Sequence, residues 1–352
     1  MSPSSGPDAA ILPREAGGTG ATMGDARTGR TDPLSLKEPL AGHIAVIGAG
    51  GFIGRSLTSR AAGLGRDVLG IVRSRQAAAR VDRAGGRPME VAGLDPDVLS
   101  RALEGAVAVV HLAQVGAERG VATYEAVNVG GTRRVIAAAR AAGVGRVVLF
   151  SGLGVARYGM SRRCTNPYFL SKLAAEVELF RSDREAFVFR PSYVVGPGDG
   201  LVSALVRQLT SGDVERPGDG SYRLQPVAVA DAAAAAMAAV EAPVPRGARV
   251  IDLVGPEAVS YDACIARVAL AAQAEGRPVA GGIRGIPVAE AERQAAAGGY
   301  RGMLPDELDC LLCDETSDPG PLIELLGRPL TPLDEALREA VRGVTGPTIP
   351  PA

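Results

Sequence analysis

The feature that most constrains the fold is a glycine-rich loop between an apolar run and a helix-like stretch. The apolar run covers residues 43–47, the glycines follow as Gly48, Gly51 and Gly54 in a G-x-x-G-x-x-G pattern, and residues 52–62 have a helical pattern. The first glycine permits a tight turn, the second lets backbone approach a diphosphate, and the third allows close helix–strand packing. We therefore predict a phosphate-binding turn that leads into a helix N-terminus.

Apolar runs and helix-like stretches continue to alternate through the first half of the chain. Further strands are expected at residues 67–72, 107–111, 146–150 and 186–190, with a helical stretch at 124–142. Strands that alternate with helices at this spacing indicate a parallel sheet with helices on both faces. The predicted fold class is therefore α/β, a Rossmann-type doubly wound parallel sheet with a smaller C-terminal α/β lobe.

Domain limits follow from composition. Residues 1–41 are rich in Gly, Pro, Ser, Thr and Ala without apolar periodicity, so a disordered leader is expected there. We assign 42–195 to the dinucleotide-binding domain, 196–345 to a substrate lobe and 346–352 to a tail. The apolar run 249–253 is expected to return to the main sheet. Helices of the lobe are expected at 261–274, 288–297, 305–313 and 332–341.

Composition excludes several functional classes. Hydrophobic residues are 46% and charged residues 22% of the 352 residues, as in ordinary globular proteins. The formal net charge of −1 offers no basic surface for nucleic acid. No apolar run approaches the roughly 20 residues of a membrane span, and four cysteines in so long a chain do not indicate a disulfide framework. A cytoplasmic protein is expected, with no membrane span and no nucleic acid partner.

The residues that follow the second expected strand bear on the cofactor. Arg73, Ser74 and Arg75 stand where an acid would otherwise accept a hydrogen bond from a ribose hydroxyl. A guanidinium matches phosphate bidentately, so Arg73 and Arg75 are predicted to hold a 2′-phosphate. NADP(H) is therefore favoured over NAD(H). The alternative is two solvated arginines in an arginine-rich chain.

Lysine is almost absent, since only Lys37 and Lys172 occur among 38 basic side chains. Lys172 follows Tyr168 by four residues, so the two side chains share one face of a helix. An ammonium beside a phenol favours the phenolate and lowers the tyrosine pKa, which would make Tyr168 a general acid and base. The alternative is a surface Tyr–Lys pair without a function.

The glycine loop together with Tyr168-x-x-x-Lys172 resembles the extended and atypical short-chain dehydrogenase/reductase superfamily, which includes epimerase/dehydratase-like proteins. Five further segments resemble motifs of that superfamily. In chain order they are residues 109–113, 128–132 (N-x-x-G-T), 190–199 (R-P-x-x-V-x-G-P), 225–233 (V-x-V-x-D-x-A) and 253–257. The resemblance covers about residues 43–275 and implies the Rossmann-type fold.

The resemblance also implies residue roles. Tyr168 would exchange the proton of a substrate alcohol or carbonyl, Lys172 would also hold the nicotinamide ribose, and Asn128 would support a water relay. The residues assigned to the cofactor are Gly48, Gly51, Phe52, Ile53, Gly54, Arg73, Ser74, Arg75, His111, Leu112, Ala113, Lys172, Pro191, Ser192 and Val194.

One departure from the superfamily concerns a serine or threonine hydroxyl that normally follows the fifth strand. Alignment from the strand end places Gly152 there, and alignment backwards from the next Tyr-Gly pair places Gly154 there. Ser151 is the nearest substitute, with Ser161 and Thr165 farther away. Loss of one hydrogen-bond donor to the transition state lowers the reaction rate by a factor on the order of 10²–10³.

Two functions remain open. The first is an NADP(H)-dependent oxidoreductase or epimerase/dehydratase that acts on an unidentified carbonyl or alcohol substrate through Tyr168 and Lys172, assisted by Ser151 and Asn128. The second follows from similarity of residues 151–168 to the branch of the nucleotide-binding accessory subunit of respiratory complex I. It implies a non-catalytic NADPH-binding accessory or assembly protein, peripheral to the inner membrane. The first is compatible with a homodimer, the second with docking to a respiratory complex.

Other chemistry-bearing residues are interpreted as structural. Cys310 and Cys313 lack a second cysteine pair to complete a metal site, so their spacing indicates a buried helix face. His43 and His111 have no partner at ligand spacing, and no metal site is predicted. Glu176 is expected on a solvated helix face.

Overall fold

The computed structural model describes residues 42–243 and 247–345, all of which belong to one compact unit. The expected leader (1–41) and tail (346–352) lie outside the described residues. The predicted boundary between residues 195 and 196 stays a prediction.

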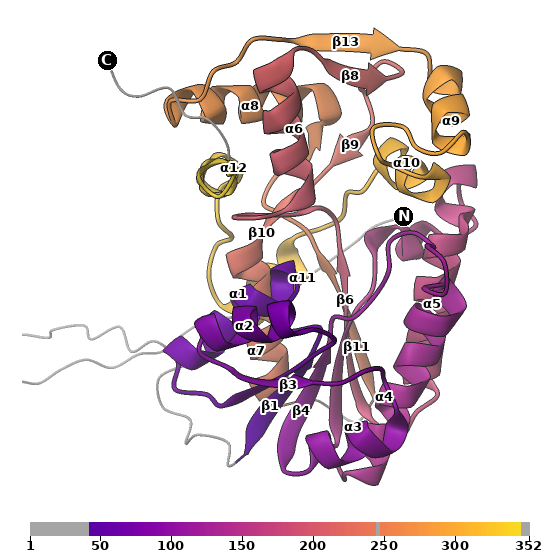
Figure 1. Ribbon diagram of the computed structural model, residues 1–352, viewed down its shortest axis with the longest axis vertical. Coiled ribbons are helices and arrows are strands. Elements are labelled where there is room, and N and C mark those ends of the chain that lie inside the picture. The colour runs from indigo at the N-terminus through magenta and orange to yellow at the C-terminus, as the bar shows by residue number, and fades with distance from the viewer. Residues whose placement is uncertain (1–41, 244–246, 346–352) are drawn as a thin grey trace, which may run out of the picture. The chain divides into compact units, whose positions relative to one another are not determined.

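A seven-stranded parallel sheet carries the fold, in the order β11-β6-β5-β4-β1-β2-β3 (Figure 1). The predicted α/β doubly wound class is confirmed. The strand order reverses between β1 and β4, and ligands of such sheets bind at the carboxyl ends of the strands at this point. The strands are β1 (His43–Ile47), β2 (Val68–Val72), β3 (Arg87–Glu90), β4 (Ala106–His111), β5 (Arg146–Phe150), β6 (Glu185–Pro191) and β11 (Ala248–Leu253).

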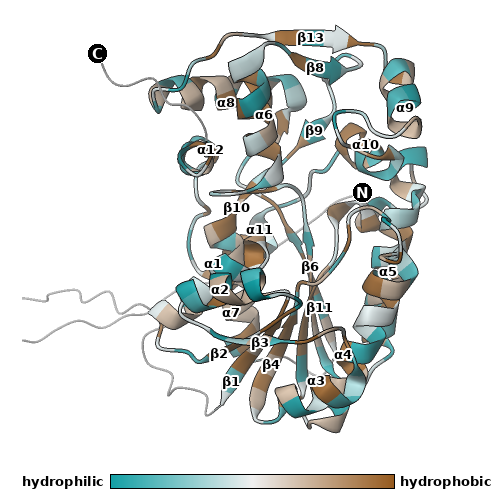
Figure 2. Cartoon of the chain, viewed as in Figure 1, coloured by the Kyte–Doolittle hydropathy of each residue, from teal (hydrophilic) through white to brown (hydrophobic). Residues whose placement is uncertain are grey.

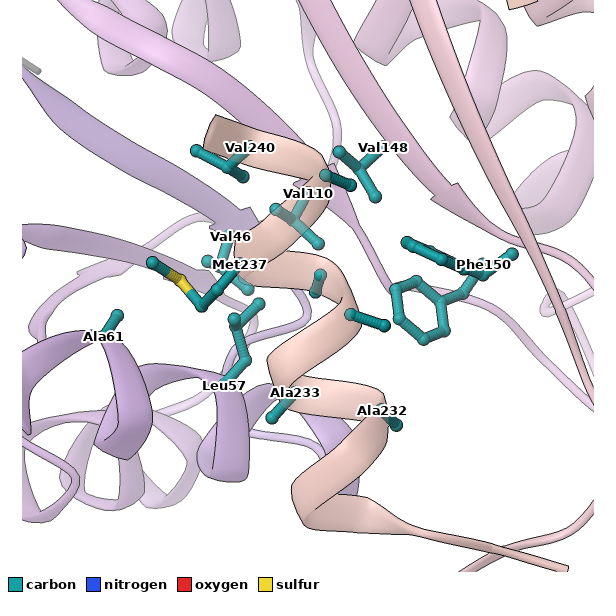
Figure 3. Close-up of a cluster of buried hydrophobic side chains, with 14 of the residues drawn as sticks. Val46, Leu57, Ala61, Val110, Val148, Phe150, Ala232, Ala233, Met237 and Val240 are labelled. Atoms are coloured by element: carbon teal, nitrogen blue, oxygen red, sulfur yellow. The ribbon is translucent and has the colours of Figure 1, made fainter. Parts of the chain in front are cut away.

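Helices cover both faces of the sheet because its central strands are apolar on both sides, as the brown strands in Figure 2 show. On one face Val46, Val110 and Val148 pack against Leu57 and Met237 (Figure 3). This face is covered by α1 (Phe52–Gly63), α2 (Arg75–Arg83), α7 (Val229–Glu241) and α11 (Gly320–Leu326). The other face is covered by α3 (Pro96–Leu103), α4 (Gly130–Ala141) and α5 (Pro167–Phe180).

A second core lies in the C-terminal part of the chain, where Leu205, Val268 and Leu337 are fully buried together. Its helices are α6 (Gly200–Ser211), α8 (Tyr261–Ala274), α9 (Val288–Ala296), α10 (Pro305–Leu312) and α12 (Leu333–Arg342). Four of these helices were predicted, within one residue at each end. Short strands complete this part: β7 (Val194–Val195), β8 (Val214–Pro217), β9 (Arg223–Leu224), β10 (Val227–Ala228), β12 (Val259–Ser260) and β13 (Ile283–Ile286).

The single helix expected over residues 124–142 is divided. Residues Tyr124–Val129 form a π-helix, η1, and α4 continues from Gly130. The wider π-helical turn leads directly into the α-helix. Such π-helical turns occur frequently at functional sites. After β5 two 3₁₀ turns follow, η2 (Leu153–Arg157) and η3 (Arg162–Thr165).

Candidate active site

The glycine loop has the geometry that a bound diphosphate requires. Gly48 has a φ of +89°, and a Cβ atom there would stand 3.0 Å from the backbone nitrogen of Ala113. At Gly54 a Cβ atom would stand 2.5 Å from the Gly48 carbonyl oxygen. Gly51 precedes α1 and supplies no side-chain cap, so the first-turn N–H groups beside Phe52 are left for an anion. These observations fit a dinucleotide.

Two arginines stand exposed at the end of β2. Arg73 and Arg75 are not paired with a carboxylate within the described residues. Ser74 between them caps α2, where its hydroxyl accepts a hydrogen bond from the Ala77 N–H (3.3 Å). The segment thus offers two free guanidinium groups near the glycine loop, since Gly50 of that loop packs closely against Ala77.

Tyr168 and Lys172 lie one turn apart at the start of α5. The helix begins there because Pro167 occupies its first position and the Asn166 side chain accepts a hydrogen bond from the Phe169 N–H (2.9 Å). Lys172 is only 3% exposed. Its ammonium donates to the carbonyl oxygen of Phe150 at the end of β5 (2.6 Å).

Gln114 joins the two residues, and sequence reasoning missed it. Its Oε1 accepts a hydrogen bond from the Lys172 ammonium, and its side chain also hydrogen-bonds the Tyr168 hydroxyl. Gln114 follows directly after His111, Leu112 and Ala113, the last residues that the β4 motif had assigned to the cofactor. The sequence signal that could have identified Gln114 is a polar side chain one residue beyond that motif.

Burial dominates the ionisation of this pair. Burial lowers the pKa of Lys172 to about 7, although Glu176 opposes the shift. Burial also raises the pKa of Tyr168, and the charges of Cys310 and Glu315 raise it further. The predicted lowering of the Tyr168 pKa by Lys172 is therefore wrong for this structure, because the ammonium contacts Gln114 and a backbone carbonyl instead of the phenol.

The structure decides which glycine occupies the position of the missing hydroxyl. A Cβ atom on Gly152 would lie 3.7 Å from the Tyr168 hydroxyl oxygen, whereas one on Gly154 would overlap the ring of Phe169. Gly152 is therefore the position that faces the reactive phenol. The substitute considered from sequence, Ser151, is 1% exposed, and its hydroxyl has no hydrogen-bond partner in the described parts of the chain.

The more distant hydroxyls are engaged locally. Ser161 accepts a hydrogen bond from the Cys164 N–H (3.4 Å) and caps η3. Thr165 donates to the carbonyl oxygen of Arg162 (2.6 Å). Neither faces the phenol in place of the missing group.

Asn128 ties the loop after β4 to α5. Its Nδ2 donates to the Val115 carbonyl (3.1 Å) and to the Ser171 hydroxyl (2.9 Å), and its Oδ1 accepts from the Val115 N–H (2.9 Å). Asn128 is buried in the π-helix η1, whose wide turn carries it. These bonds position α5 and the residues next to Gln114. The predicted water relay stays a prediction.

The remaining cofactor candidates line the strand ends. Burial and the charge of Lys172 lower the pKa of His111 to about 3, so its ring is neutral. Leu112 continues from β4 beside β1, where its N–H donates to Ile47 (2.9 Å). Ile53 is partly buried against the core. Pro191 ends β6, Val194 begins β7, and the buried Ser192 lies between them.

The expectation that Glu176 faces solvent is wrong. It is 0% exposed, and Arg190 of the R-P motif binds it through two hydrogen bonds of 3.0 and 2.6 Å. The pair fastens α5 to β6, so it helps to set the position of the Tyr168 and Lys172 helix. Spacing along the helix could not reveal this, because the partner lies on another element.

A cavity of about 470 Å³ lies between the turns after β5 and the C-terminal elements. It is lined by Met160, Cys164, Val288, Leu312 and Tyr222 among others. Cys164, which lines the cavity, also belongs to the buried cluster against which Tyr168 packs.

The charged groups of the cavity wall are already engaged. Arg157 donates to the carbonyl oxygens of Asp314 (2.6 Å) and Thr316 (2.9 Å). Arg163 is paired with Asp309 (2.6 Å) and Glu292 (3.1 Å). Both guanidinium groups thus bind acceptors within the protein.

Residues 44–252 match the NAD dependent epimerase/dehydratase family. The chain belongs to this family. This epimerase/dehydratase-family protein is therefore an enzyme of the oxidoreductase or epimerase type, with a nicotinamide nucleotide as its cofactor. The sequence prediction of the broad family is confirmed.

Two curated relatives of this epimerase/dehydratase-family protein are reductases. The 2-alkyl-3-oxoalkanoate reductase of Stenotrophomonas maltophilia (strain K279a) is 32% identical over 223 residues, which cover 58% of this chain and 67% of the relative. The ceramide reductase of Caulobacter vibrioides (strain NA1000 / CB15N) is 30% identical over 208 residues, which cover 58% of this chain and 62% of the relative.

Among solved structures, MoeE5 in complex with UDP-glucose and NAD has a TM-score of 0.66 and 25% identity, and the match covers 86% of this chain and 98% of that chain. UDP-glucuronic acid 4-epimerase from Bacillus cereus has a TM-score of 0.66 at 19% identity, with 86% and 98% covered, and shares the fold. No helix in residues 42–243 and 247–345 has the length and apolar character to cross a membrane. Within the same residues no cluster of three or more His, Cys, Asp or Glu side chains suits a metal ion.

Proposed function

We propose that the protein is an NADP(H)-dependent reductase that converts a ketone on an apolar substrate into an alcohol. The observation that carries this proposal is the meeting of Tyr168 and Lys172 at the end of β5. The phenol faces Gly152, and the ammonium lies on the carbonyl of Phe150 two residues earlier. An acid and a cation at the carboxyl edge of the sheet suit proton transfer to a substrate oxygen.

The cavity between the turns after β5 and the C-terminal elements supports the proposed substrate class. Its wall includes apolar Met160, Val288 and Leu312, while Arg157 and Arg163 already donate to protein acceptors. A diphosphate requires cations that are free to bind it, so an apolar chain fits this wall better than a sugar nucleotide. The two curated relatives bear the names 2-alkyl-3-oxoalkanoate reductase and ceramide reductase, in agreement with the proposal.

The chain's own residues divide the chemistry. The first turn of α1 and the glycine loop would hold the diphosphate, and the bound nicotinamide supplies the hydride. Tyr168 gives its proton to the substrate oxygen as that oxygen gains negative charge. Gln114 holds the phenol and the Lys172 ammonium in one arrangement. Lys172 lies one turn from the phenol on the same helix, with its ammonium on Gln114 and on the Phe150 carbonyl.

Arg73 and Arg75 support the preference for NADP(H). Both are exposed, and no carboxylate competes for them within the described residues. A 2′-phosphate would find two guanidinium groups at the end of β2, where no acid is present to bind a ribose hydroxyl.

The test mixes NADPH-loaded protein with ethyl 3-oxodecanoate or ethyl 3-oxobutanoate and follows the nicotinamide absorbance. We expect oxidation of NADPH with the long-chain ester, slower oxidation with the short one, and none with Tyr168→Phe. Equal loss of absorbance with wild type and Tyr168→Phe, or no oxidation of NADPH with either ester, would contradict the proposal.

A second candidate is an NADPH-binding accessory or assembly protein of a respiratory complex I-like assembly. It is favoured by Gly152, which leaves the phenol without the hydroxyl that usually assists turnover. In that case saturated NADPH binding would occur without turnover, and the protein would sediment with solubilised complex I. A reductase would instead sediment alone, as a monomer or a homodimer.

A further inference from the structure

Arg55 lies in the first turn of α1, next to the glycine loop. Its backbone N–H and its side-chain Nε both donate to the carbonyl oxygen of Gly51, at 3.1 and 3.3 Å. Side chains on a helix lean toward its N-terminus, and Arg55 stands only about 4.5 Å farther along the helix axis than Phe52. The guanidinium is therefore held over the same turn whose free N–H groups suit a diphosphate.

The turn between β7 and α6 packs on this part of α1. A Cβ atom on Gly196 would lie 3.6 Å from the Phe52 ring, and one on Gly198 would lie 3.2 Å from a terminal nitrogen of Arg55. Gly198 also has a φ of +90°, a conformation that favours glycine. A glycine at this position therefore leaves room for the guanidinium between the turn and the glycine loop.

The acid of that turn does not neutralise Arg55. Asp199 is 4% exposed, and its carboxylate accepts hydrogen bonds from the N–H groups of Gly196 (3.1 Å) and Val202 (2.7 Å). Within the part of the chain that the structure describes, no carboxylate pairs with Arg55, and the bond to Gly51 is the one hydrogen bond of its side chain. Its terminal N–H groups are thus left for a ligand.

The charge of a dinucleotide diphosphate calls for a free cation at this place. A diphosphate is doubly negative, whereas a helix N-terminus contributes the equivalent of about half a positive charge. The glycine loop from Gly48 to Gly54 contains no basic residue, so it binds an anion through backbone N–H groups alone. A guanidinium adds a full charge and binds two phosphate oxygens at once. Arg55 therefore has the chemistry that the loop lacks.

We propose that Arg55 is a binding residue for the cofactor, whose guanidinium pairs with the diphosphate on the glycine loop. This assignment needs only the nicotinamide nucleotide of the family and does not depend on the proposed substrate. Arg55 differs in its role from Arg73 and Arg75, which are proposed to bind the 2′-phosphate. Because NADH and NADPH share the diphosphate, Arg55 contributes to the affinity for both.

The test compares wild type with Arg55→Gln, which removes the charge, by isothermal titration with NADPH, NADH and ADP-ribose. We expect the affinity for all three to fall by a similar factor of about 10-fold to 100-fold, because each ligand carries the diphosphate. Arg55→Lys, which keeps the charge but not the planar fork, should recover part of the loss. The control is Arg60→Gln, which removes the same charge near the other end of α1 and should leave the affinities within about two-fold.

The pattern across the ligands separates a diphosphate contact from other roles. Loss of NADPH affinity alone would place Arg55 at the 2′-phosphate. Unchanged affinity for all three ligands would show that the guanidinium does not bind the cofactor, and equal losses in Arg55→Gln and Arg60→Gln would show an effect of net charge. Each of these three results would overturn the assignment of Arg55 to the diphosphate.

A second readout does not depend on affinity. In the phosphorus NMR spectrum of protein saturated with NADPH, the diphosphate resonances of Arg55→Gln and Arg55→Lys should be displaced from their wild-type positions. The resonance of the 2′-phosphate should keep its position, because that group is proposed to contact Arg73 and Arg75 instead. Diphosphate resonances that stay at their wild-type positions in both variants would contradict the proposed contact.

Discussion

The hydroxyl oxygen of Tyr168 lies 3.7 Å from the point where a Cβ atom would stand on Gly152. The two other nearest atoms belong to the Phe169 ring and lie at ordinary contact distances of 3.4 and 3.7 Å from that point. The backbone of Gly152 is extended, with φ of −151°, so any residue adopts it without strain. The relationship separates Gly152 from Gly154, which sequence alignment had left equivalent.

Alanine substitution should therefore affect the two glycines differently. Gly152→Ala should change the free energy of unfolding by less than about 1 kcal/mol, whereas Gly154→Ala should lower it by about 1–3 kcal/mol or more, because its methyl group meets the Phe169 ring. Urea denaturation of both variants measures the difference. Equal stabilities would mean that Phe169 moves aside freely.

The buried ammonium of Lys172 should make stability depend on pH. Its pKa is about 7 in the folded protein and about 10.5 when unfolded, so between these values the unfolded state binds more protons. Stability of the wild type relative to Lys172→Met should then rise with pH from about 7 to about 10, by at most about 1.4 kcal/mol per unit. Denaturation of both proteins across that range measures the slope. A difference that stays constant with pH would contradict the lowered pKa.

Breaking the Arg190–Glu176 ion pair should lower the free energy of unfolding substantially. Arg190→Leu leaves the fully buried Glu176 carboxylate without its partner, and we expect a loss of about 3–5 kcal/mol. The matched control is Arg87→Leu, which breaks an exposed bidentate pair with Asp67 and should cost less than about 1 kcal/mol. Chemical denaturation compares the two, and similar losses would show that burial of Glu176 does not determine the cost.

Removing both arginines after β2 should change cofactor selectivity. The double variant Arg73→Ala, Arg75→Ala should bind NADPH about 10-fold to 100-fold more weakly, because it loses charge-assisted hydrogen bonds to the 2′-phosphate. NADH affinity should stay within a few fold. Isothermal titration with both cofactors measures this, with Arg83→Ala on the exposed face of α2 as control. Parallel loss of NADH and NADPH affinity would argue against a 2′-phosphate site.

Local sequence patterns were sufficient for the sheet and the glycine loop. Strands His43–Ile47 and Arg146–Phe150 have the bounds read from their apolar runs, since a strand buried on both faces shows a continuous apolar run. The loop was readable because the turn at Gly48 demands a positive φ that glycine adopts readily. The i, i+4 spacing likewise placed Tyr168 and Lys172 on one helix face.

Tertiary structure decided the chemistry around them. The contact of Gln114 with Lys172 and the burial of Glu176 against Arg190 each join residues from different elements. The direction of the Tyr168 pKa shift was mispredicted for the same reason. Spacing along one helix fixes which side chains share a face, but burial and partner charges depend on which distant segments fold against that face.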